Sequence, residues 1–169
     1  MITNRTYRPL EAILAGGGLA ATFDIVYAFI RSGQHGRSPL WVLQSVASGW
    51  LGNSAFEGGM PAGILGVLSH YSILFVAAGL YYVCSRRWVF LASRPIASGL
   101  VFGVLVYLFM NFVVLEHSAF PFHPSYPLPK LLEGFASHAI FVGLPIATFV
   151  AMARVPAVTR GEGPTARKR

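Results

Sequence analysis

The sequence predicts an all-α integral membrane protein: a four-helix bundle with an additional short amphipathic or re-entrant helix between spans one and two. Three observations support this fold class. Of the 169 residues, 54% are hydrophobic and only 11% are charged, and four apolar runs are each long enough to cross a bilayer. A soluble domain carries about 25% charged residues. We therefore expect a single transmembrane domain over residues 1–154.

The four predicted spans are the long apolar runs of the chain. They cover residues 10–31, 61–84, 96–116 and 131–153. The first contains Asp24, which argues against a cleaved signal peptide. The second and third lack formal charges in their interiors, and basic residues flank them. The fourth contains Pro145, which a membrane helix tolerates when its neighbours satisfy the freed carbonyl.

The segment between spans one and two predicts a short helix over about residues 39–52. Ser38 and Pro39 are typical of a helix start, and the apolar residues from Leu40 to Leu51 recur at helical spacing without any charge. About 12 residues are too few to span a bilayer. We expect this helix to lie in the outer interface or to dip partway between the spans. The segment 118–130, rich in proline and aromatic residues, should cap the same face.

The basic residues indicate how the chain is oriented. The net charge is +7. Ten basic residues lie on the side of both termini (Arg5, Arg8, Arg86, Arg87, Arg94, Arg154, Arg160, Arg167, Lys168 and Arg169), and three lie on the other side (Arg31, Arg37 and Lys130). The excess of cytoplasmic Lys and Arg in membrane proteins predicts that both termini are cytoplasmic. Residues 155–169 should form a basic, flexible cytoplasmic tail. Because the basic residues stand at the ends of apolar runs, we expect lipid and not nucleic acid as the partner.

Polar residues within the spans are the candidate site, because an ionisable group in a bilayer is costly and marks function by default. The candidates for binding a ligand or relaying protons are Asp24, His70, Asn111 and His138. The predicted topology places all four in the outer half of the membrane, one from each span. Small residues at helical spacing, such as Gly66 before His70, indicate that these faces point into the bundle.

A second set of candidates, Glu116, His117 and Glu133, lies at the outer boundary of the spans. Each polar residue also has a structural interpretation. The asparagine and the histidines can be hydrogen-bond partners between helices, and Asp24 can pair with a histidine or with Arg31. Whether the layer of histidine and aspartate is structural or functional stays open at this point.

No motif fixes a reaction, so the sequence leans against an enzyme and assigns no catalytic residue. The first hypothesis is a binding or accessory membrane subunit whose polar layer holds the bundle together or lines a small pocket. The main alternative is a b-type haem electron carrier, with His70 and His138 as axial ligands across the core. A further alternative is a small proton- or ion-coupled transporter, with Asp24, His70 and His138 as the relay. Four helices would then have to form a homo-oligomer or join a larger membrane complex.

A metal-dependent membrane enzyme is the weakest alternative. It would be built on His117, His123, Glu133 and His138. Their spacing matches no standard zinc pattern such as H-E-x-x-H. The metal, if any, therefore stays unknown.

Several short motifs, none of them chemically specific, carry a resemblance to known sequences. They are ASGWLG at 47–52, AFEGG at 55–59, Leu65-Gly66 with His70, Tyr81-Tyr82, Arg94-Pro95 and YLFMN at 107–111. Over about residues 10–150 the chain resembles an uncharacterised family of small bacterial inner-membrane proteins with four predicted spans. The resemblance implies a bacterial origin and a location in the inner membrane. It implies no established activity, ligand or partner.

Overall fold

A computed structural model of the chain describes residues 8–122 and 125–153. It confirms the predicted fold class, because four helices are long and apolar enough to cross a membrane and a shorter helix joins the first two. These spans are Pro9–Gly33, Gly59–Arg87, Pro95–Val114 and Leu128–Met152. The chain is therefore a multi-pass membrane protein in contact with the lipid bilayer. The predicted basic tail lies outside the described residues.

The helices in chain order are α1 (Pro9–Gly33), α2 (Pro39–Leu51), the 3₁₀ turn η1 (Gly52–Phe56), α3 (Gly59–Arg87), α4 (Phe90–Ser93), α5 (Pro95–Phe109), η2 (Met110–Val114), α6 (Leu128–Ser137), η3 (His138–Gly143) and α7 (Leu144–Met152). Helices α1, α2, α5 and α6 have a proline in the first turn. Proline is tolerated there because the N–H groups of a first turn have no hydrogen-bond partner within the helix. At α2 the Ser38 hydroxyl accepts from the Trp41 amide at 3.1 Å. The sequence did not predict the short α4 or the two π turns, η2 and η3.

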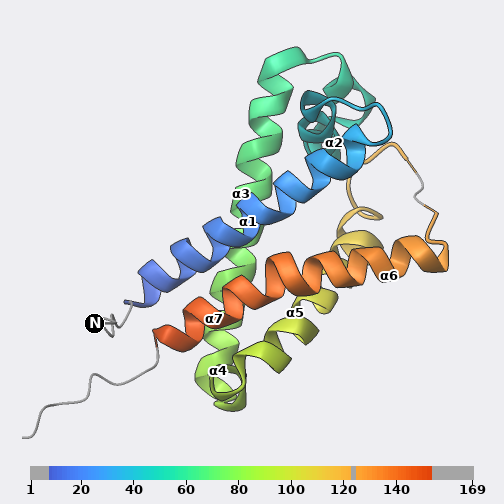
Figure 1. The fold of residues 1–169 in the computed structure, drawn as a ribbon. Helices are drawn as coiled ribbons and strands as arrows, with labels where there is room; N and C mark the ends of the chain where they lie inside the picture. The colour runs from blue at the N-terminus through green and yellow to red at the C-terminus, as the bar shows by residue number, and fades with distance from the viewer. Residues whose placement is uncertain (1–7, 123–124, 154–169) are drawn as a thin grey trace, which may run out of the picture.

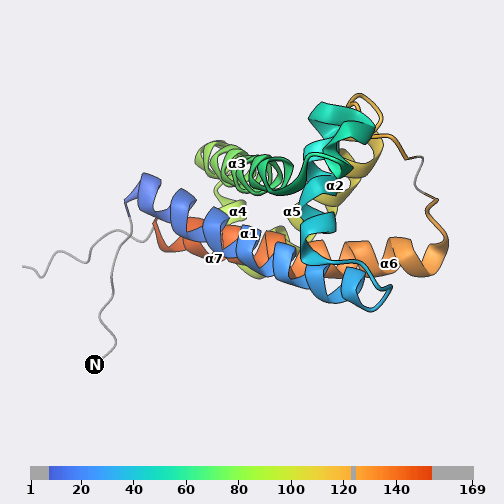
Figure 2. The same ribbon diagram turned by 90° about the horizontal axis from the view of Figure 1, so that it is seen from above.

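Helix α1 lies between two neighbours (Figures 1 and 2). It runs beside the continuous α6–η3–α7 helix in the opposite direction, and it also packs against α3, which crosses it. Helix α5 packs against η3 and α7, whereas α2 packs against α3. Helices α1 and η2 finish at one end of the bundle, and α3 and α6 begin there. We call this the α2 end. A groove separates α3 from α5, so the bundle is open on that side.

The core contains several small side chains, which let membrane helices approach closely. Its fully buried members include Ala20, Ala21, Ala78 and Ala147. Tyr81 is the largest fully buried side chain among the described residues, and its hydroxyl donates to the Leu91 carbonyl at 2.9 Å. That bond ties α3 to α4.

Several backbone contacts depend on glycine, and two of them hold neighbouring helices against a cavity at the α2 end. A methyl group on Gly66 would lie 2.0 Å from the Leu43 carbonyl oxygen, and one on Gly103 would lie 2.2 Å from the His138 carbonyl oxygen. The first contact holds α2 on α3, and the second holds α5 on η3. Gly66 therefore faces the short helix, whereas the sequence predicted that its face points into the four-helix bundle. The predicted small residues mark a close contact, but the partner is α2.

Candidate functional site: a cavity at the α2 end

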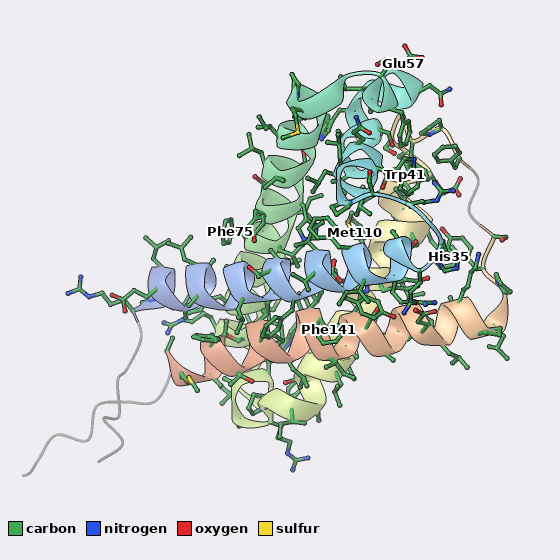
Figure 3. The ribbon with its side chains drawn as sticks, turned by 45° about the horizontal axis from the view of Figure 1, so that its top comes forward. His35, Trp41, Glu57, Phe75, Met110 and Phe141 are labelled. Atoms are coloured by element: carbon green, nitrogen blue, oxygen red, sulfur yellow. The ribbon has the colours of Figure 1, made fainter. Side chains whose placement is uncertain are left out.

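A cavity of about 740 Å³ lies among α1, α2, α3, α5 with η2, η3 and the segment that follows η2. Its polar lining residues are Asp24, Ser45, Ser69, His70, His117, Ser118 and His138. The other lining residues are mainly aliphatic and aromatic. Met110, the first residue of η2 and one of these lining residues, is labelled in Figure 3. Three of the four predicted intramembrane residues thus line one cavity.

Asp24 and His138 face each other across this cavity. The Oδ1 atom of Asp24 lies 3.9 Å from Nδ1 of His138, and the two side chains are 17% and 22% exposed. This distance is too long for a hydrogen bond. Among the described residues, Asp24 accepts no hydrogen bond, whereas Nδ1 of His138 also lies 3.4 Å from the Ser137 hydroxyl oxygen. The His138 ring stands edge-on to the ring of Tyr107, with centroids 5.0 Å apart. The Asp24 carboxyl group therefore remains available to a third group.

His70 has a closer protein partner. Its ring is buried, and Nε2 lies 3.0 Å from the Ala21 carbonyl oxygen of α1. A carbonyl can only accept, so Nε2 carries the hydrogen and Nδ1 is the nitrogen with a free lone pair. His70 thus ties α3 to α1 while its ring lines the cavity. An axial haem ligand would have to bind through Nδ1 or give up this bond, and the haem hypothesis stays a prediction.

Asn111 is not among the residues that line the cavity. Its Nδ2 donates to the Tyr107 carbonyl at 2.9 Å, and its own carbonyl accepts from the Tyr126 hydroxyl at 3.1 Å. It therefore fastens the segment before α6 to η2. Burial raises the pKa of Tyr126 above its usual value, and the nearby Tyr107 and Glu116 add to the shift. The preceding residue on the chain, Met110, takes the place in the cavity that we expected for Asn111.

The three boundary candidates lie in different surroundings. Glu133 accepts from Arg31 through both carboxylate oxygens, with Nη2 at 2.9 Å from Oε2, and also from the Tyr27 hydroxyl at 2.5 Å. This group joins α1 to α6. His117 lines the cavity, with Nδ1 at 2.7 Å from the Val113 carbonyl oxygen. Glu116 is exposed on the turn after η2.

The residues suggested for a metal site do not form one cluster. Glu133 is bound to Arg31 and does not line the cavity, whereas His117 and His138 do. His123 lies outside the described residues. Within 8–122 and 125–153, no group of three or more His, Cys, Asp or Glu side chains is placed to hold a metal ion.

Sequence reasoning missed other lining residues, notably Trp50, Ser69 and the apolar residues of η2. The Trp50 indole N–H donates to the Ser69 hydroxyl at 3.0 Å, which brings α2 to α3 at the edge of the cavity. An uncharged short helix gave no signal of this contact. Comparison with protein-family models, with curated proteins and with solved structures gives no match to this chain.

Proposed function

We propose that the chain is a membrane-embedded binding protein, acting alone or as an accessory subunit, whose ligand occupies the cavity at the α2 end. The observation that carries this proposal is the convergence of Asp24, His70 and His138, from three separate spans, on one cavity. Each ionisable side chain within a span is costly in a bilayer. The cavity volume of about 740 Å³ falls within the range of about 300–1,000 Å³ that is typical of small-molecule sites.

The composition of the lining supports the same proposal. Ligand pockets combine a mostly apolar wall with a few placed polar groups that fix the orientation of the ligand. Here the wall is apolar, and the Asp24–His138 pair supplies a carboxylate and an imidazole at a separation of 3.9 Å. One polar atom of a ligand between them can hydrogen-bond to both. The buried His70 ring adds a third polar group held in place by the Ala21 carbonyl.

The orientation that we propose places both termini in the cytoplasm and the cavity in the outer half of a bacterial inner membrane. The ten-to-three distribution of basic residues and the family resemblance support it. Single cysteines test it in a Cys84→Ser background. A membrane-impermeant maleimide applied to intact cells should label Asn53→Cys near α2 and spare Ser93→Cys in α4. The reverse labelling pattern would overturn this orientation.

Binding is tested with the purified protein. Small molecules retained by the wild type through purification are released and identified by mass spectrometry, and the same is done for Asp24→Asn and His138→Gln. We expect a retained molecule that both variants lose. Glu57→Gln is the matched control. Glu57 is exposed in the turn before α3 and does not line the cavity (Figure 3). Identical retained molecules in all four proteins would contradict the proposal.

A small proton-coupled transporter is the second candidate, and the Asp24–His138 pair favours it. A separation of 3.9 Å is short enough for one water molecule or one ligand atom to pass a proton between them. Proton uptake by vesicles containing the protein should then be lost in Asp24→Asn. We expect such a transporter to assemble as a homo-oligomer, which cross-linking in the membrane would detect. Unchanged uptake in Asp24→Asn would end this candidate.

A further inference from the structure

An apolar groove adjoins the cavity on the open side of the bundle. It lies between α3 and α5 and has a volume of about 1,080 Å³. Along α3 it extends from Leu65 to Leu80, about 22 Å at 1.5 Å per residue. Its walls are aliphatic and aromatic except for a few polar atoms. Wall residues such as Val76 and Leu105 are exposed, so the groove is open to the surroundings of the protein. The groove has the length for an extended hydrocarbon chain.

The groove and the cavity share part of their walls. Trp50, Ser69, Ile73, Val106 and Met110 are among the residues that line both. Ser69, which lines both voids, directly precedes His70 of the cavity in α3, so the polar lining lies beside the groove at this level of the helix. The two voids are therefore adjoining halves of one space, with ionisable groups in one half and hydrocarbon walls in the other. This division matches a ligand with a polar head and a long apolar chain.

We propose that the ligand is a neutral, single-chain lipid whose head carries a hydroxyl group, and this inference rests on the proposed function. The head lies in the cavity at Asp24 and His138, and the chain lies in the groove between α3 and α5. A hydroxyl can donate to the Asp24 carboxylate and still accept from the His138 ring. The lipid enters sideways from the bilayer, since the groove is open between α3 and α5, which meet at Tyr81 and Ser98 beyond its end.

The charge of the lining distinguishes neutral from anionic lipids. Among residues 8–122 and 125–153, none that lines the cavity or the groove is Arg or Lys. Phosphate recognition normally uses such cations or a helix N-terminus, and the carboxylate of Asp24 would repel a phosphate. We therefore expect discrimination against a lipid that has the same chain and a phosphate on its head.

The test measures binding of three probes to the purified protein in detergent. Monooleoylglycerol has the proposed head and chain, oleoyl lysophosphatidate adds a phosphate, and monobutyrylglycerol shortens the chain. Trp50 fluorescence reports binding in a Trp41→Phe, Trp88→Phe background, because its indole lies where the two voids meet. We expect monooleoylglycerol to bind saturably and at least tenfold more tightly than either other probe. Native mass spectrometry of the unsubstituted protein gives the same comparison if the background replacements disturb folding.

Variants separate the chain site from the head site. Ser72→Phe and Ala77→Phe fill the groove from α3, so each should weaken monooleoylglycerol binding at least tenfold. Val83→Phe is the matched control, since Val83 is exposed on the same helix but does not line the groove. It should bind monooleoylglycerol like the wild type. A thermal melt of each variant shows that it is folded.

Three results would overturn the lipid inference. The first is equal affinity for all three probes, and the second is equal binding by the groove variants and the Val83→Phe control. The third is a disulfide-linked dimer formed through Ser72→Cys in a Cys84→Ser background, which would place a second copy of the chain in the groove. If a retained molecule that depends on Asp24 is found but monooleoylglycerol does not bind, the lipid inference fails and the proposed binding function stands.

Discussion

The contact between α5 and η3 gives the sharpest prediction about the stability of this bundle. In Gly103→Ala the new methyl would lie 2.2 Å from the His138 carbonyl oxygen and 2.6 Å from the Ala139 Cα atom. An ordinary carbon–oxygen contact is about 3.3–3.6 Å, so α5 must move away from η3 by about 1 Å. Overpacking of this kind costs about 1–3 kcal/mol, and the obstructing atoms are backbone, which places the cost near the upper limit.

Alanine also favours the helix, and this gain must be subtracted. Glycine in a helix is less favourable than alanine by up to about 1 kcal/mol, so we expect Gly103→Ala to lose about 2 kcal/mol of unfolding free energy. Gly79→Ala in α3 is the matched control, because a methyl there meets no atom within 4 Å. It should be neutral or gain up to about 1 kcal/mol. The two variants should therefore differ by about 2–3 kcal/mol, a factor of about 30–150 in the unfolding equilibrium.

Unfolding in mixed micelles with increasing denaturing detergent, followed by circular dichroism, measures this difference. Gly103→Ala should unfold at a lower denaturant fraction than the wild type, and Gly79→Ala at an equal or higher one. Coincident transitions for the two variants would show that α5 and η3 do not approach as closely as 2.2 Å implies. The placement of His138 in the cavity, which depends on that contact, would then lose its support.

Three further outcomes follow from other contacts. Gly66→Ala would place a methyl 2.0 Å from the Leu43 carbonyl oxygen, so protease sensitivity between α2 and α3 should rise, whereas a variant with intact protection would refute this contact. Burial raises the pKa of Tyr126, so the free energy of unfolding should hold below about pH 10 and fall above it as pH approaches the raised value. In Tyr126→Phe, the free energy of unfolding should fall less steeply with alkaline pH than in the wild type. Glu133→Gln removes the ion pair with Arg31, so high salt should lower the melting temperature of the wild type more than that of the variant.

The secondary structure was predictable because its signals are local. Apolar runs of span length, proline in the first turns and the Ser38–Pro39 start all act within a few residues, and the four long helices and the short fifth one agree with them. The packing order was not predictable from the same signals. In a bilayer the lipid is as apolar as the core, so the spans have no polar face to show which side packs. The open side between α3 and α5 is a consequence of helix crossing that no single segment encodes.

For the candidate site, the sequence predicted the depth of the residues in the membrane better than the direction of their side chains. Counting residues from the span ends placed Asp24, His70 and His138 at similar depths, and the structure brings their side chains to one cavity. The same count included Asn111, which bonds to Tyr107 instead. Depth follows from position along the helix, but direction depends on the helical phase. The π turn that begins at Met110 changes that phase, and nothing in the sequence MNFVV indicates it.

The π turns themselves bear on where function lies in this fold. A π turn is rare, inserts an extra residue into a helix and recurs at functional sites. Both π turns of the described residues contribute to the cavity wall: η2 through Met110, Val113 and Val114, and η3 through His138 and Val142. In a bilayer, irregular backbone is tolerated where protein buries it or where it lines a cavity. The irregular turns and the ionisable side chains therefore coincide at one level of the bundle. If that level served packing alone, regular helices with apolar side chains would fill it at lower cost, so the coincidence argues for a ligand there.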